Sequence, residues 1–133
     1  MPQTFKIDQA ATFSGVALLS IEPKLDFGSE IQAVTSDGVP KWEAQVVAGF
    51  RQFNRTVNEV LKIGLVSHTN PMDGLQPYTP VQLIDFEIGV MPRERKDRDT
   101  GQTEIIGVQV WYRCAEIRPI SAVGRGKLHE ISA

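Results

Sequence analysis

The chain has 133 residues, of which 41% are hydrophobic and 23% charged, and its formal net charge is −2 at pH 7. This composition predicts one globular domain and excludes wholesale disorder. The single cysteine, Cys114, excludes an internal disulfide and a multi-cysteine metal site, and fits a reducing compartment. The start resembles no signal peptide, and no apolar run approaches the roughly 20 residues that span a bilayer. We therefore expect a cytoplasmic protein with no membrane partner.

Basic residues gather in the later part of the chain. Residues 1–50 hold three of the 14 Lys and Arg, against six of the 16 Asp and Glu. The other basic residues lie between 51 and 133, so a positive patch can form there on a nearly neutral molecule.

The first half of the chain predicts an irregular arm followed by strands. Residues 1–12 have no strong period, and residues 13–21 predict a first strand that ends before Pro23. A short strand at 31–35 precedes a turn at Ser36-Asp37-Gly38. Two longer strands then follow at 41–47 and 57–66. Alternation at these strands assigns one set of side chains to the core: Trp42, Ala44, Val46, Leu61, Ile63 and Leu65.

The second half predicts one long hairpin. Three prolines exclude a regular helix from most of residues 68–80. Residues 81–90, with Ile84, Phe86 and Ile88 inward, and residues 103–117 predict the fourth and fifth main strands. Residues 121–133 predict a loose tail. The sequence therefore predicts an all-β fold, a small five-stranded barrel over residues 13–120 with no long helix.

The tip of the hairpin, residues 92–102, is rich in charge. Its cations are Arg93, Arg95, Lys96 and Arg98, and three acids lie among them. One interpretation is a solvated loop that keeps the hairpin soluble. The other is that these long cationic side chains contact phosphates.

The strand after this tip has two different faces. The face expected in the core carries Val108, Val110, Tyr112 and Cys114. The opposite face carries Gln109, Trp111 and Arg113, an arrangement that suits base stacking beside a cation. Alternatively, Trp111 packs under the Tyr78 loop or at a dimer interface.

Residues 49–55 predict a loop in which aromatic and basic side chains alternate. Arg51, Phe53 and Arg55 suit a flexible nucleic-acid-binding loop. In the alternative interpretation, the phenylalanines of this loop cap the barrel.

Residue types that support catalysis are sparse. The histidines are His68 and His129, and Cys114 is expected to be a buried, unreactive thiol. No metalloprotease, nucleophile-elbow or phosphate-loop motif occurs. We expect a non-enzymatic protein that needs no cofactor and no metal.

Three segments resemble the single-stranded DNA-binding (SSB) family, whose fold is the OB barrel. Residues 38–47 are similar to its tryptophan-bearing strand, residues 78–89 to its fourth strand, and residues 93–110 to its basic turn and closing strand. The resemblance implies an OB barrel that binds single-stranded DNA without chemistry, often as a homo-oligomer. It implies contacts through the 93–98 cations and Trp111.

Two features depart from that family. The proline-rich segment 68–80 replaces most of a helix, and the chain ends without an acidic, phenylalanine-ended tail. These departures argue against a housekeeping replication role and leave room for a dedicated version serving a plasmid, phage or mobile element.

The leading hypothesis is therefore single-stranded DNA binding, with RNA left open as the ligand. The alternative is a structural or protein-interaction barrel that uses the Trp111 face as an oligomer interface. The candidate nucleic-acid-binding residues are Arg51, Phe53, Arg55, Lys62, Arg93, Arg95, Lys96, Arg98, Gln109, Trp111 and Arg113.

Overall fold

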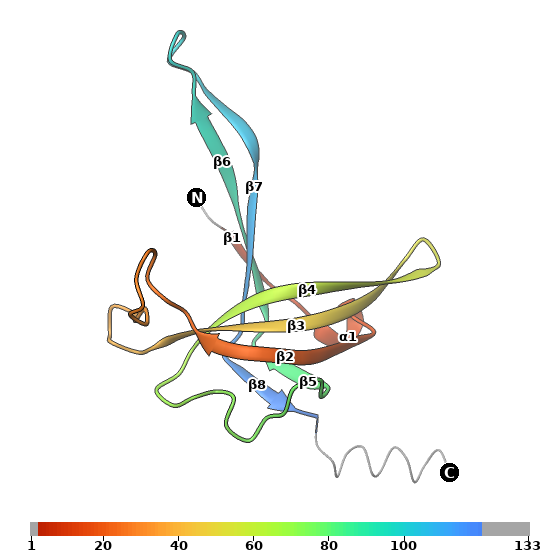
Figure 1. Ribbon diagram of the computed structural model, residues 1–133. Helices are drawn as coiled ribbons and strands as arrows, with labels where there is room; N and C mark the ends of the chain where they lie inside the picture. The colour runs from red at the N-terminus through yellow and green to blue at the C-terminus, as the bar shows by residue number, and fades with distance from the viewer. Residues whose placement is uncertain (1–2, 121–133) are drawn as a thin grey trace.

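The computed structural model describes residues 3–120, and these residues form an all-β fold (Figure 1). The one helix among them, α1 (Gln9–Thr12), is a single turn, so the prediction of an all-β chain with no long helix is confirmed. The strands are β1 (Gln3–Lys6), β2 (Gly15–Pro23), β3 (Lys41–Gln52), β4 (Arg55–Val66), β5 (Val81–Ile84), β6 (Glu87–Lys96), β7 (Thr103–Arg113) and β8 (Glu116–Pro119). No helix within residues 3–120 is long and apolar enough to cross a membrane.

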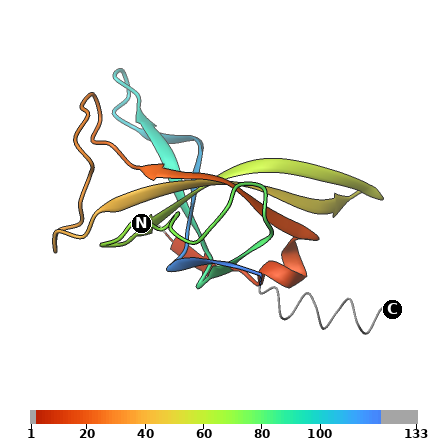
Figure 2. The same ribbon diagram turned by 60° about the horizontal axis from the view of Figure 1, so that its bottom comes forward.

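Six strands form one curled sheet in the order β1-β6-β7-β4-β3-β2, and β5 pairs with β8 in a separate two-stranded sheet. The pairs are antiparallel except for β4 and β7, which are parallel. The free edge of β2 bends toward β5, where the Leu18 N–H donates to the Thr79 carbonyl at 2.9 Å. The curled sheet and the small sheet thus enclose the core as a half-barrel (Figure 2).

The core lies on one face of β2, β3 and β4, where the sequence pattern alternates. The six side chains expected there, Trp42, Ala44, Val46, Leu61, Ile63 and Leu65, are all buried. The indole Nε1 of Trp42 donates to the Ser67 carbonyl at 2.9 Å, so its polar atom is satisfied. Period-two alternation predicted these strands because one face of each packs on the core while the other faces solvent.

Residues 49–55 form the end of a hairpin rather than a loop. β3 and β4 pair without interruption from Lys41↔Val66 to Gln52↔Arg55. A two-residue turn joins them, with φ of 52° at Phe53 and 61° at Asn54. Positive φ at both central residues matches the twist of a tight antiparallel hairpin.

Both long strands expected near the end of the chain divide in two. Residues 81–90 break between β5 and β6, where Asp85 has φ of 52°. Residues 103–117 break between β7 and β8, directly across the hairpin from the break between β5 and β6. The break shifts the alternation, so that Val81, Leu83 and Phe86 are buried while Ile84 and Ile88 are half-buried.

Other segments also differ from the expectation. Residues 3–6 pair with β6 as β1, where the sequence predicted an irregular arm. Residues 31–35 form no strand and contribute only the isolated bridges Leu25↔Gln32 and Val34↔Pro40. Residues 68–80 contain no helix, as the prolines predicted. The tail expected at 121–133 lies outside the described residues.

The outer parts of β6 and β7 extend well beyond the half-barrel (Figure 1). We call this extension, residues 90–110, the arm. Val108 is 61% exposed and Val110 is 45% exposed, so the prediction that both lie in the core is wrong. Of the four side chains predicted on that face, Cys114 is buried and Tyr112 is half-buried. Alternation on β7 continues into the arm, but within residues 3–120 no second layer covers it there.

Candidate functional site

A groove lies on the outer side of the sheet where β4 and β7 part. The two strands pair only through Ile63↔Tyr112 and Gly64↔Arg113, after which β7 rises into the arm. The corner between them encloses about 540 Å³. Its polar and aromatic lining consists of Lys24, Glu43, Lys62, Gln109, Trp111, Tyr112 and Arg113.

The indole of Trp111 is fixed by a glycine on the neighbouring strand. Trp111 pairs with Gly89 of β6, and the two lie directly opposite each other. A Cβ atom built on Gly89 would overlap the Cε2, Cζ2 and Nε1 atoms of the ring. The indole therefore lies across the bare backbone of Gly89, half-buried, and also lines the groove. Cross-strand packing of an aromatic ring on a glycine stabilises the sheet and limits the positions of the ring.

Arg113 is held beside this ring by an ion pair. Its Nε donates to Oε2 of Glu87 on β6 at 2.6 Å. The two side chains are 54% and 21% exposed, so the pair contributes only about 0.2–1 kcal/mol to stability. The pair also restricts the positions of the guanidinium group, and Arg113 lines the groove.

The groove lining carries more positive than negative charge. Lys24, Lys62 and Arg113 contribute three cations, and Glu43 contributes the one carboxylate among the lining residues. Lys62 on β4 is exposed. It lies on the face opposite the buried side chains of Leu61 and Ile63. Proteins that bind single-stranded nucleic acids combine cations with aromatic rings in this way.

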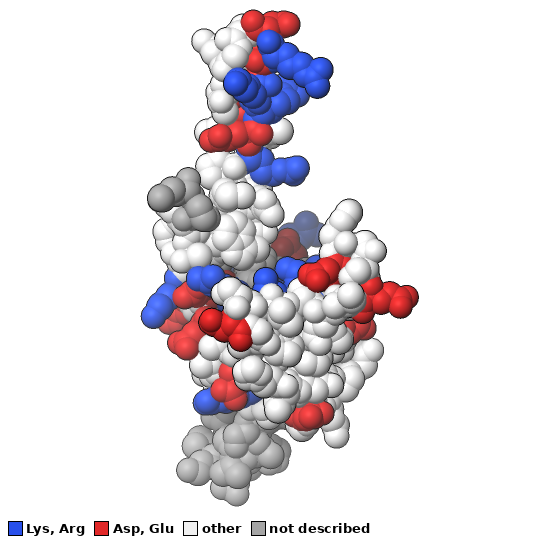
Figure 3. Space-filling view, turned by 90° about the vertical axis from the view of Figure 1, so that its left-hand side faces the viewer, with Lys and Arg blue, Asp and Glu red and all other residues white. Residues whose placement is uncertain are grey.

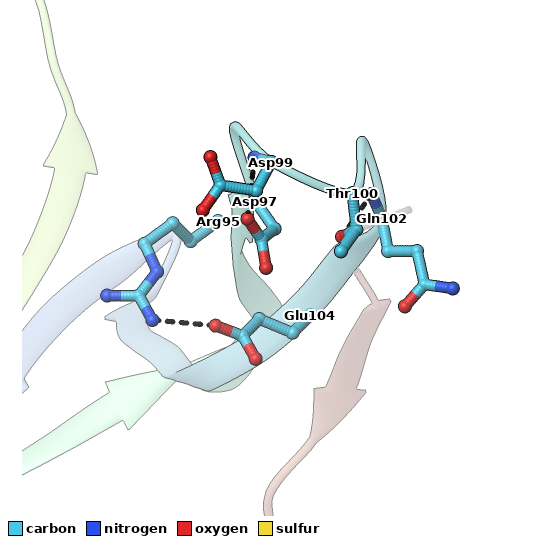
Figure 4. A network of polar contacts seen from close by, with 6 residues as sticks. All are labelled: Arg95, Asp97, Asp99, Thr100, Gln102 and Glu104. Atoms are coloured by element: carbon cyan, nitrogen blue, oxygen red, sulfur yellow. Dashed lines mark hydrogen bonds and ion pairs between the residues drawn. The ribbon is translucent and has the colours of Figure 1, made fainter.

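The arm tip has balanced charge. Residues 93–104 contain four basic side chains and four acidic ones, the latter being Glu94, Asp97, Asp99 and Glu104. Figure 3 shows Lys and Arg interleaved with Asp and Glu at the tip. Arg95 pairs with Glu104 across the hairpin at 2.6 Å (Figure 4), whereas no other ion pair joins tip side chains in the described chain.

Short hydrogen bonds order the turn at this tip. The Asp99 N–H donates to Oδ1 of Asp97 at 2.8 Å, and the Gly101 N–H donates to the Asp97 carbonyl at 2.8 Å. Gly101 has φ of 71°, which suits glycine. Arg93, Lys96 and Arg98 are exposed around this turn.

The third group of candidate residues lies at the β3–β4 turn, away from the arm (Figures 1 and 2). Arg51 donates to Oγ1 of Thr56 and to the Asn54 carbonyl, both at 3.2 Å. Phe53 is 88% exposed, while Phe50 packs edge-on against Phe13 at a ring separation of 6.5 Å. One phenylalanine thus packs on the barrel and the other faces solvent.

The candidates therefore occupy three places rather than one surface. The groove brings together Lys62, Gln109, Trp111 and Arg113; the arm tip holds Arg93, Arg95, Lys96 and Arg98; the β3–β4 turn holds Arg51, Phe53 and Arg55. Sequence reasoning missed Lys24, because only the fold brings the residue after β2 to the groove. It also missed two exposed aromatics, Phe27 (107%) and Tyr78 (79%). An aromatic in the Asp-, Gly- and Ser-rich loop after β2 was the available signal for Phe27.

Histidine and cysteine are absent from the lining of this groove within residues 3–120. Burial raises the pKa of the Cys114 thiol to about 12, so the reactive thiolate is disfavoured. Within residues 3–120, no group of three or more His, Cys, Asp or Glu is arranged to hold a metal ion. Comparison of the sequence with protein-family models and with curated proteins finds no match.

Proposed function

We propose that this chain binds single-stranded DNA in the groove between β4 and β7, without catalysing a reaction. One observation carries the proposal: the indole of Trp111, fixed on Gly89, lines the same groove as Lys24, Lys62 and Arg113. Stacking of a base on an aromatic ring contributes about 1–3 kcal/mol, and nearby cations attract the phosphates. Gln109, next to the ring on the same face of β7, adds an amide that can hydrogen-bond a base edge.

The strand connections support assignment of the half-barrel to the OB fold. In an OB barrel the first strand contacts the second and the fourth, and the third runs parallel to the fifth. Here β2 pairs with β3 and meets β5, and β4 runs parallel to β7. We therefore assign β2, β3 and β4 as the first three OB strands, the divided β5–β6 as the fourth and the divided β7–β8 as the fifth. OB proteins bind oligonucleotides on the face of the second and third strands, between two flanking loops.

The proposed groove lies at that face. It is bordered by β3 and β4, and the loop after β2 contributes Lys24. That loop also exposes Phe27, which offers a second stacking surface. The arm corresponds to the other flanking loop, and its exposed Arg93, Lys96 and Arg98 can meet phosphates that leave the groove.

The charges predict a modest salt dependence. Three groove cations release counterions from about three phosphates, and each phosphate contributes about −0.7 to the slope of log K against log salt. The expected slope is about −2. The balanced charge of the arm tip adds little to it.

Titration of an oligo-dT against the protein tests the proposal through fluorescence anisotropy and tryptophan quenching. Lys62→Glu is expected to weaken binding at least fivefold, because it reverses a charge in the groove. Arg118→Glu is the matched control, since it makes the same change on β8, outside the groove. No binding at low salt, or an equal loss in both variants, would falsify the proposal.

Two further titrations test the role of the aromatic ring and the choice between DNA and RNA. Trp111→Phe keeps an aromatic ring over Gly89 and is expected to retain more affinity than Trp111→Ala. Replacing oligo-dT with oligo-U determines whether RNA is the preferred ligand. Light scattering on Trp111→Ala tests the alternative in which this face is an oligomer interface, which predicts dissociation of that variant.

A further inference from the structure

One face of the arm is apolar and exposed. Cross-strand register places Val90 beside Val110 and Pro92 beside Val108, and Phe5 of β1 continues the same face next to Ile88. Phe5 is 51% exposed, Val108 61% and Val110 45%. A hollow of about 290 Å³ on this part of the molecule is lined by Gln3, Val90, Met91, Pro92 and Val108. We call Phe5, Val90, Pro92, Val108 and Val110 the apolar arm face.

This face is the side of β7 opposite Trp111, because successive residues of a strand point to opposite sides. It is continuous with the core through Tyr112, which pairs with Ile88 and stacks on Phe86 at a ring separation of 6.0 Å. An apolar stripe therefore leaves the core and runs outward along the arm. A hairpin with a bare apolar face is marginally stable in water, so the stripe requires a covering layer.

We propose that a second copy of this chain supplies that layer, with the two apolar arm faces packed against each other about a two-fold axis. A two-fold contact uses the same patch on both copies, and a nearly flat apolar sheet face fits such a contact. The proposed dimer does not rest on the proposed function, because its contact uses the side chains of β7 opposite Trp111, of which Val110 also lines the groove.

The area fits a dimer. From their exposures, the five side chains present roughly 350 Å² of apolar surface. One side of a standard interface holds about 450 Å² of apolar surface, so the arm approaches the size that a stable dimer needs.

The charge at the arm tip is compatible with contact between two copies. Four cations and four acids between residues 93 and 104 sum to zero, so two tips brought together by the packed faces do not repel. Interleaved signs allow cation–acid pairs between copies.

Light scattering coupled to size-exclusion chromatography of the full chain at micromolar concentration tests this inference. The wild type is expected to be a dimer and Val108→Arg a monomer. Val66→Arg is the matched control, because Val66 is 46% exposed at the end of β4 and lies outside the arm. A monomeric wild type, or a Val108→Arg variant that remains dimeric, overturns the inference.

A second variant keeps the test informative if Val108→Arg fails to fold. Val108→Cys places one exposed thiol on each arm, while the native Cys114 is buried. A short bifunctional thiol reagent is expected to cross-link this variant into a covalent dimer. Absence of the cross-link, with Cys at position 66 as the control for chance collisions, contradicts the proposed contact.

Discussion

Replacement of Gly89 by alanine tests the packing on which the groove depends. A Cβ at this position would overlap three atoms of the Trp111 ring, so either the indole must leave the sheet or the strands must shift. Such overpacking costs about 1–3 kcal/mol. For a domain of this size each kcal/mol lowers Tm by about 4 °C, so we expect a decrease of about 4–12 °C.

The assay is thermal and urea unfolding followed by circular dichroism, with acrylamide quenching to report exposure of the indole. Gly107→Ala is the control, because a Cβ there meets nothing within 4 Å. It is expected to be neutral or to stabilise by up to about 1 kcal/mol. In a Trp111→Ala background, Gly89→Ala is expected to cause no loss of stability, because the overlap with the indole no longer occurs. An equal cost with and without the indole refutes the packing argument.

Three further predictions concern stability and reactivity. Cys114 is expected to resist thiol reagents at mildly alkaline pH in the native protein and to react in urea. Burial raises the pKa of its thiol to about 12, which stabilises the folded protein below about pH 9. That contribution disappears as pH rises toward 12. A native protein that reacts at the rate of the unfolded chain contradicts this. Phe53→Asn, at a position with φ of 52°, is expected to raise the free energy of unfolding by about 1 kcal/mol in urea titration, because asparagine tolerates the left-handed region. Ile63→Ala is expected to cost about 2–5 kcal/mol, whereas Val60→Ala, 56% exposed on the same strand, is expected to change stability by less than about 0.5 kcal/mol.

The strands of the half-barrel were predictable because their periodicity reflects burial directly. Trp42, Ala44 and Val46 alternate with polar residues, and all three are buried. The break at Asp85 was not predictable in the same way. The run Val81 to Ile88 keeps its apolar spacing on either side of the break, and a single residue with positive φ changes the phase without a glycine to signal it.

The face of β7 was predicted incorrectly for a related reason. Val108, Val110 and Tyr112 alternate as core residues do, but alternation identifies an apolar face and not what covers it. Only Tyr112 lies near the core layer, where Phe86 stacks on it. In the candidate site, the neighbours Gln109, Trp111 and Arg113 were predictable because they lie on one strand. Lys24 was not, since its proximity depends on how the sheet curls.

The two-pair contact between β4 and β7 has a consequence for how the chain folds. The β3–β4 hairpin forms from neighbouring residues, whereas the pairing of Ile63 with Tyr112 must close a loop of about 50 residues, which costs more entropy. Local hairpins form first and distant pairings follow. Since the groove exists only once β7 reaches β4, we expect strand content to return early in refolding and the ability to bind a ligand to return last.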